Sequence, residues 1–135
     1  MFQIVRSNPP TMEKPPGYSH IVVIEGGARI VFFAGQLGVD TSGAFAGGRG
    51  DFKAQTVQAF ENLKAALAAV GATFNDVVKV NNYLVDIAAH LPIYREVRDR
   101  YVNTSQPPAS TTIGVPALAR GDALYEVEAV VMLAR

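Results

Sequence analysis

The chain has 135 residues, of which 49% are hydrophobic and 18% charged, as expected for a single globular domain with one hydrophobic core. Twelve basic and twelve acidic side chains give a formal net charge of zero, which argues against a nucleic-acid partner. There is no cysteine, so a disulfide framework, a thiol nucleophile and a cysteine-ligated zinc site are excluded. No apolar run is long enough for a signal peptide or a membrane span, and the expected compartment is the cytoplasm.

The first part of the chain predicts three short strands. Residues 2–6 alternate in polarity and fit an edge strand. Residues 8–17 contain four prolines, which lack amide donors, so this segment is expected to be a loop. Residues 20–25 and 28–34 are rich in β-formers, and the two glycines between them predict a tight hairpin.

A helix is predicted after a glycine-rich loop. Residues 35–50 hold six glycines and no apolar period, so they are expected to form the loop. Asp51 can cap a helix that runs to about Val70, and Gly71 is placed to end it in a left-handed conformation. Apolar residues at three- and four-residue steps define the buried face of this helix: Val57, Phe60, Leu63, Leu67 and Val70.

The second half of the chain predicts three more strands and one helix. Residues 77–85 read as a strand, and residues 88–102 as a helix whose Pro92 is tolerated because it falls in the first turn. The apolar stripe of this helix is Ile87, Leu91, Tyr94, Val97 and Tyr101. Residues 111–115 and 123–133 are then expected to be strands.

The element order β-β-β-α-β-α-β-β predicts an α+β fold, in which one mixed sheet of five or six strands carries two helices on one face. The last strand, however, is apolar on both faces. Two helices can cover only one face of such a sheet, and the other would leave a large apolar patch in water. Self-association is the expected solution.

Glu126 and Glu128 interrupt the apolar run of the last strand. A strand places them on the same face, about 7 Å apart. Burial would raise the pKa of a carboxylate there, and perturbed carboxylates often mark reactive or binding sites. In the alternative interpretation, both are paired with Arg or Lys across a subunit contact, or lie at a solvated sheet end. The strand alone leaves both interpretations open.

Several segments, in order along nearly the whole chain, resemble RidA/YjgF proteins. They are Tyr18 after a Pro-Gly step, AGQ at 34–36, NDVVKV at 75–80, PASTTIGV at 108–115, LA at 118–119 and YEVEA at 125–129. The resemblance implies a chorismate mutase-like fold and a homotrimer whose sheets form a central barrel with the helices outside. It also implies that small-molecule ligands bind in clefts between subunits.

The same resemblance implies roles for individual residues. Well-characterised members hydrolyse reactive enamines and imines, such as 2-aminoacrylate, to ketoacids and ammonia. Glu126 matches the catalytic acid/base glutamate, which would orient or activate water. Tyr18 and Gly35 match substrate-binding positions, as an aromatic side chain and a backbone contact, and Thr112 stands where many members have a cysteine.

Three positions depart from the pattern of the deaminating members. Ser110 replaces an arginine that would clamp a substrate carboxylate, and a serine can donate only one neutral hydrogen bond. Ala34 replaces a serine, and Tyr94 replaces an asparagine of the cleft. The chain thus resembles an arginine-lacking branch of the family. This favours a ligand without that carboxylate over 2-imino acid deamination.

Three functions remain to be compared. The first is an enzyme that hydrolyses the C=N bond of an enamine or imine, and the second is a non-catalytic module that binds a small metabolite. The third, RNA cleavage or inhibition of translation, is disfavoured by the neutral charge.

The remaining charged residues suggest no further site. No cofactor is expected, because His20 and His90 have no metal-ligand spacing. Arg95, Arg98 and Arg100 alternate with acidic residues and are interpreted as part of a solvated helix face.

Overall fold

The computed structural model describes residues 2–135, and these residues form six strands and two α-helices. A single 3-10 turn, η1 (Phe74–Asp76), precedes the fourth strand. The elements in chain order are β1 (Gln3–Ser7), β2 (Ile21–Glu25), β3 (Ala28–Leu37), α1 (Phe52–Ala69), β4 (Val77–Val85), α2 (Ile87–Arg98), β5 (Ala109–Val115) and β6 (Tyr125–Ala134).

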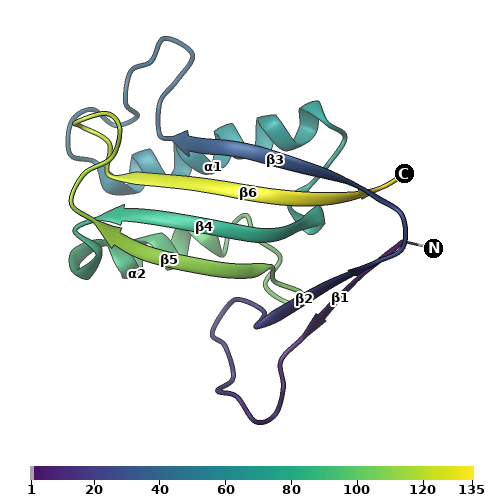
Figure 1. The fold of residues 1–135 in the computed structure, drawn as a ribbon. Helices are drawn as coiled ribbons and strands as arrows, with labels where there is room; N and C mark the ends of the chain where they lie inside the picture. The colour runs from purple at the N-terminus through teal and green to yellow at the C-terminus, as the bar shows by residue number, and fades with distance from the viewer. Residues whose placement is uncertain (1) are drawn as a thin grey trace.

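Four of the strands form one mixed sheet in the order β3-β6-β4-β5. β6 is antiparallel to both neighbours, whereas β4 and β5 are parallel and are joined through α2. Both helices lie on the same face of this sheet (Figure 1). The predicted α+β fold with its helices on one side is therefore confirmed, although β1 and β2 form a two-stranded ribbon of their own.

The predicted hairpin at Gly26 and Gly27 is wrong. β2 pairs with β1, and β3 pairs with β6, beginning with Ala28 opposite Ala134. Gly26 has φ 91°, so the glycines do make a sharp bend. This bend passes the chain from the ribbon to the main sheet, because the long C-terminal strand offers β3 a partner that β2 cannot match in length.

β3 extends beyond the predicted strand, to Leu37, and so includes residues 35–37, which were expected to lie in a loop. The register with β6 shifts between Phe33 and Gln36, which places Ala34 and Gly35 in a bulge. Such bulges re-aim side chains at the edge of a sheet.

Helix α1 begins and ends close to the predicted residues. The Asp51 side chain accepts a hydrogen bond from the Ala54 amide at 3.0 Å, and Gly71 follows the helix with φ 75°. Three residues of the predicted apolar stripe are fully buried against the sheet: Phe60, Leu63 and Leu67.

Helix α2 differs from the prediction at Pro92. The proline lies inside the helix, in its second turn, and the helix ends at Arg98 rather than at Val102. Pro92 deprives the Ala88 carbonyl of its usual amide partner. Both residues are exposed, so water can satisfy that carbonyl. Tyr94 and Val97 of the predicted stripe are buried.

The two faces of β6 confirm the predicted alternation. Its odd-numbered residues from Tyr125 to Leu133 are buried under the helices, whereas the even-numbered ones are half-buried on the face that no helix covers. On that open face, Phe32 and Ile30 of β3 lie opposite Val130 and Met132 and are 77% and 55% exposed. An apolar surface thus remains there in the single chain. Among the described residues, no helix is long and apolar enough to cross a membrane.

Candidate functional site

The candidate site residues fall into two groups on opposite faces of the main sheet. Tyr18, Tyr94, Ser110 and Thr112 line one pocket of about 290 Å³ on the helix side, beside the outer edge of β5. The other residues that line it are Pro16, Ile87, Leu91, Arg95 and Arg98. Glu126 and Gly35 lie together on the open face. The six predicted residues therefore form two separate groups, which we call half-sites. One is the set of pocket residues on the helix side, and the other is Glu126 with Gly35 on the open face.

Ser110 and Thr112 are held by a buried chain of hydrogen bonds. Both project from β5 to the helix side, with Thr112 opposite Asn82 of β4 and Ser110 opposite Val80. The Tyr125 hydroxyl donates to Asn82 Oδ1 at 2.6 Å, which fixes the orientation of the amide. Asn82 Nδ2 then donates to Thr112 Oγ1 at 3.2 Å and, more weakly, to Ser110 Oγ at 3.5 Å. The two hydroxyl oxygens are thus used as acceptors.

Tyr94, a residue of α2, lines the same pocket as these hydroxyls. Its hydroxyl is buried and lies near the Thr112 and Ser110 hydroxyls and the Arg98 guanidinium. Burial raises the pKa of Tyr94, and the nearby Thr112 hydroxyl and the Arg98 charge partly offset that shift. Tyr94 therefore stays protonated and able to donate at neutral pH.

Arg98 is a pocket residue that the sequence interpretation missed. The mixed-charge pattern of α2 predicted a solvated side chain, but Arg98 is only 9% exposed. Its guanidinium packs over the Tyr94 ring, 5.6 Å from the ring centre, and its Nε donates to Asp99 Oδ1 at 3.0 Å. Gly17 has φ 135°, which favours glycine, and a Cβ there would lie 2.6 Å from Arg98 Nη2. Arg98 is buried because it contacts the loop at Pro16 and Gly17, and the periodicity of a helix carries no information about such a contact.

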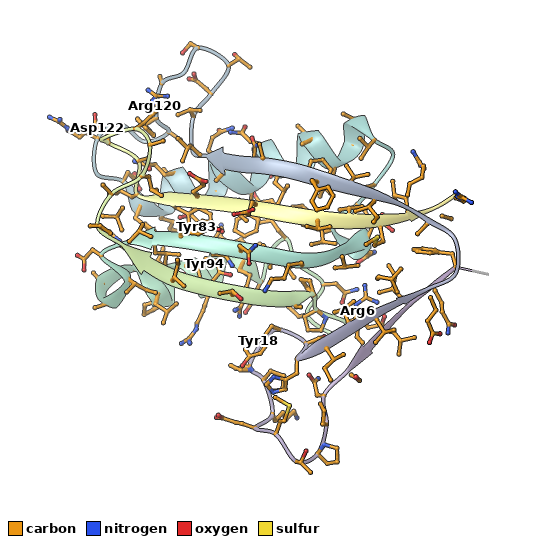
Figure 2. All side chains as sticks on the ribbon, in the orientation of Figure 1. Arg6, Tyr18, Tyr83, Tyr94, Arg120 and Asp122 are labelled. Atoms are coloured by element: carbon orange, nitrogen blue, oxygen red, sulfur yellow. The ribbon has the colours of Figure 1, made fainter. Side chains whose placement is uncertain are left out.

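Tyr18 reaches the pocket from the loop between β1 and β2 (Figure 2). The next residue, Ser19, ties this loop to the beginning of β5. Its amide donates to the Pro108 carbonyl at 2.9 Å, and its hydroxyl donates to the Pro107 carbonyl at 2.5 Å. These bonds place the Tyr18 ring beside the strand that carries Ser110.

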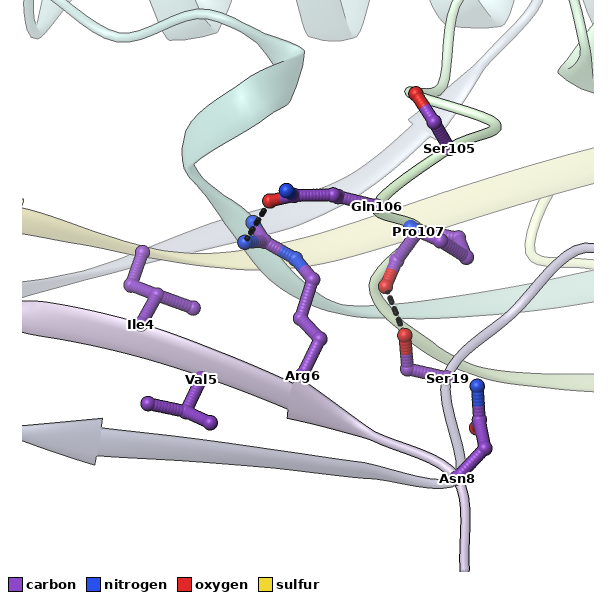
Figure 3. Close-up of a pocket in the computed structure, with 8 residues that line it drawn as sticks. All are labelled: Ile4, Val5, Arg6, Asn8, Ser19, Ser105, Gln106 and Pro107. Carbon is purple, nitrogen blue, oxygen red and sulfur yellow. Dashed lines mark hydrogen bonds between the residues drawn. The ribbon is translucent and has the colours of Figure 1, made fainter.

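A second pocket, of about 320 Å³, lies next to the same tie (Figure 3). Arg6 donates from Nη1 to Gln106 Oε1 at 3.2 Å and from Nη2 to the Asn75 carbonyl at 3.0 Å. It thereby connects β1 to the segment before β5. None of the candidate residues lies in this pocket, and its contacts brace the loop that carries Tyr18.

Glu126 occupies the open face beside the bulge of β3. A Cβ on Gly35 would lie 2.0 Å from Glu126 Oε2, so a larger residue there would force this carboxylate to move. Burial, and secondarily the charge of Glu128, raises the pKa of Glu126. Among residues 2–135, no Lys or Arg is paired with either glutamate.

Glu128 has a partner of its own on the open face. The Tyr83 hydroxyl of β4 donates a short hydrogen bond to Glu128 Oε1, and this bond raises the pKa of Tyr83. Among residues 2–135, no side chain is hydrogen-bonded to the Glu126 carboxylate, whereas the neighbouring Glu128 carboxylate is already hydrogen-bonded. The part of the chain that the structure describes contains no cluster of three or more His, Cys, Asp or Glu residues that could hold a metal ion.

These features define a class of protein. It is a small α+β protein with two helices on one face of a mixed sheet, a polar pocket at one sheet edge and an acidic residue on the open face. Residues 11–133 match the family described as Endoribonuclease L-PSP. The chain belongs to this family, which comprises the RidA/YjgF proteins.

Individual relatives match over most of the chain. Protein DfrA of Myxococcus xanthus is 37% identical over 113 residues, covering 84% of this chain and 82% of its own. The 2-iminobutanoate/2-iminopropanoate deaminase of Dermatophagoides farinae is 32% identical over 127 residues, and the match covers 92% of each chain. The Rid family protein YyfB of Yersinia pestis has a TM-score of 0.85 at 36% identity, covering 96% of this chain and 98% of that one.

Proposed function

We propose that the protein hydrolyses the C=N bond of a small imine or enamine in a cleft between subunits of a homotrimer. The observation that carries this proposal is the separation of the two half-sites. Glu126 is a half-buried carboxylate with a raised pKa on a face that the chain itself leaves uncovered. The pocket with Tyr18, Tyr94, Ser110 and Thr112 lies on the opposite face. A second copy that covers the open face can bring its pocket to Glu126 of the first.

The chemistry needs only these side chains and water. As a carboxylate, Glu126 takes a proton from a water molecule while the water oxygen attacks the imine carbon. The electron pair of the C=N bond moves to nitrogen, which takes up a proton. The carbinolamine then collapses: its hydroxyl proton passes, by way of the Glu126 carboxylate, to the amine nitrogen as the C=O bond forms, the C–N bond breaks and ammonia leaves. An enamine enters the same route after protonation at carbon. The relationship to a protein named an imine deaminase supports this reaction class.

Glu126→Gln is the variant that tests the proposal, because it removes the base and keeps the size of the side chain. Wild-type protein and variant are assayed for ammonia release on a panel of imino acids and uncharged enamines formed in situ. The expected loss is about 10²- to 10⁴-fold, the usual contribution of a general base. Glu61→Gln, on the exposed face of α1, is the matched control and should retain full activity. Equal rates for wild type and Glu126→Gln would remove Glu126 from the mechanism.

A non-catalytic binding module is the second candidate. It is favoured by Ser110, which stands where deaminating members of the family carry an arginine. Ligand-induced stabilisation without turnover would support this role, and turnover that depends on Glu126 would contradict it. RNA cleavage is not proposed, because the chain has a formal net charge of zero.

A further inference from the structure

Tyr83 of β4 is placed beside both glutamates of the open face. It stands directly opposite Glu126 in the antiparallel pairing of β4 with β6. Its hydroxyl, however, donates to Glu128 Oε1, two residues further along β6. Diagonal neighbours of this kind lie about 7–8 Å apart, within reach of a long aromatic side chain. A single side chain therefore selects one of two adjacent carboxylates as its acceptor.

Few charged groups face these two glutamates. β4 contributes Tyr83 and Lys79, and the Lys79 ammonium donates to Thr111 Oγ1 at 2.8 Å rather than to a carboxylate. Neither β5 nor the part of β3 at residues 32–37 contains a titratable side chain. Among residues 2–135, the Tyr83 hydroxyl is thus the only side-chain donor that is hydrogen-bonded to either glutamate.

Two adjacent carboxylates compete for a proton as the pH falls. Each ionised glutamate repels the charge of the other, so the first proton taken up relieves the repulsion for both. A hydrogen bond donated to a carboxylate favours its ionised form, and only Glu128 receives one from a side chain. Burial of Glu126 acts in the opposite sense, because it disfavours the charge there. Both effects direct the first proton to Glu126.

We infer that Tyr83 is a positioning residue of this site: by holding Glu128 in its ionised form, it assigns the first proton of the two glutamates to Glu126. Tyr83 acts on Glu126 through the charge of Glu128, and not through a bond of its own. The inference rests on the proposed function only in that a glutamate that takes up a proton readily is the stronger base for activating water.

The test follows the proton directly and needs no turnover. NMR of the assembled protein, labelled at the glutamate side-chain carboxyls, records the titration of Glu126, whose signal is identified by its absence from Glu126→Gln. In the wild type, Glu126 should take up a proton before Glu128 does. Tyr83→Phe keeps the ring but lets Glu128 compete for the proton, so the midpoint of the Glu126 titration should fall. The expected shift is roughly one pH unit, the size of the interaction between two neighbouring charges near a protein surface.

Two results of this titration would overturn the inference. One is a wild-type protein in which Glu128 takes up the first proton, and the other is a Glu126 titration that is the same in Tyr83→Phe as in the wild type. Tyr101→Phe is the matched control, because it removes a hydroxyl on the helix side of the sheet, where Tyr101 stacks on Phe60. It should leave the Glu126 titration unchanged, and a shift as large as that of Tyr83→Phe would also contradict the inference.

A double variant shows whether Tyr83 acts through Glu128. Glu128→Gln removes the charge that Tyr83 holds in place, so adding Tyr83→Phe to this variant should produce no further change in the Glu126 titration. A shift of the same size with and without Glu128→Gln would mean that Tyr83 acts on Glu126 by another route, which contradicts the inference.

Activity separates this inference from the proposed function. If turnover depends on Glu126, Tyr83→Phe should also move the acidic limb of the kcat/KM profile to lower pH, since the carboxylate is the active form. A shifted Glu126 titration without Glu126-dependent turnover would reject only the proposed reaction. Glu126-dependent turnover with an unshifted titration would reject only the role of Tyr83.

Discussion

At the scale of single residues, the site depends on a few close contacts. A Cβ at position 35 would displace the Glu126 carboxylate, and one at position 17, where φ is 135°, would strain the backbone and displace the Arg98 guanidinium. Asn82 is required because its amide connects Tyr125 to both pocket hydroxyls. A glycine and a buried amide thus position groups on opposite faces of one sheet.

Glu128 offers a test of how Glu126 is tuned. Burial and the charge of Glu128 raise the pKa of Glu126, so Glu128→Gln should lower that pKa towards its ordinary value. Because the carboxylate is the active form of a general base, the acidic limb of the kcat/KM profile should then move to lower pH. Glutamine can still accept the bond from Tyr83, so the fold should be preserved. A pH–rate profile of both proteins is the measurement, and an acidic limb that moves to higher pH would contradict this account.

At the scale of elements, α1 anchors the sheet and α2 shapes the pocket. α1 contacts both β3 and β6, and the buried stripe of Phe60, Leu63 and Leu67 covers the helix side of the sheet. α2 places Tyr94 and Arg98 one turn apart, both directed to the edge of β5.

Leu63→Ala tests the contribution of α1. Leu63 is 1% exposed, so its truncation should leave a cavity and reduce the free energy of unfolding. The expected loss is about 2–5 kcal/mol. Val57→Ala, at a half-buried position of the same helix, should cost clearly less. Urea unfolding at a fixed protein concentration measures both, since assembly makes the apparent stability depend on concentration. Equal losses for the two variants would show that α1 is not packed as described.

At the scale of the whole molecule, one face of the main sheet is left uncovered by the chain, and the two groups of candidate residues lie on opposite faces. The helices bury one face, and the other exposes Phe32 and Ile30 beside the half-buried Val130 and Met132. Covering this surface with other copies would remove apolar area from water and bring the two half-sites together.

Phe32→Asp should therefore dissociate the proposed trimer. A charge on the open face would have to be buried unpaired in the assembly, at a cost that exceeds the gain from association. Sedimentation velocity should show a trimer for the wild type and smaller species for the variant, together with loss of turnover. Ala65→Asp adds the same charge to the exposed side of α1 and should leave the trimer intact. A monomeric wild-type protein in dilute solution would end the proposal of a cleft between subunits.

Local patterns in the sequence were sufficient for most of the fold. The caps and stripe of α1, the bounds of β4 and the two faces of β6 follow from periodicity and turn chemistry, which act over a few residues. The position of Glu126 on an uncovered face follows from the same alternation. For this reason the fold class and the acidic residue were predicted before any contact was known.

Partners across long sequence separations had to come from the folded chain. Gly26 and Gly27 predict a bend equally well whether β2 pairs with β1 or with β3, and the choice depends on the length and apolar character of β6. Arg98 follows the same charge pattern as its exposed neighbours on α2, and it is buried because the loop at Gly17 lies over it. Both outcomes depend on residues more than 70 positions away, and helix or strand periodicity carries no information about such contacts.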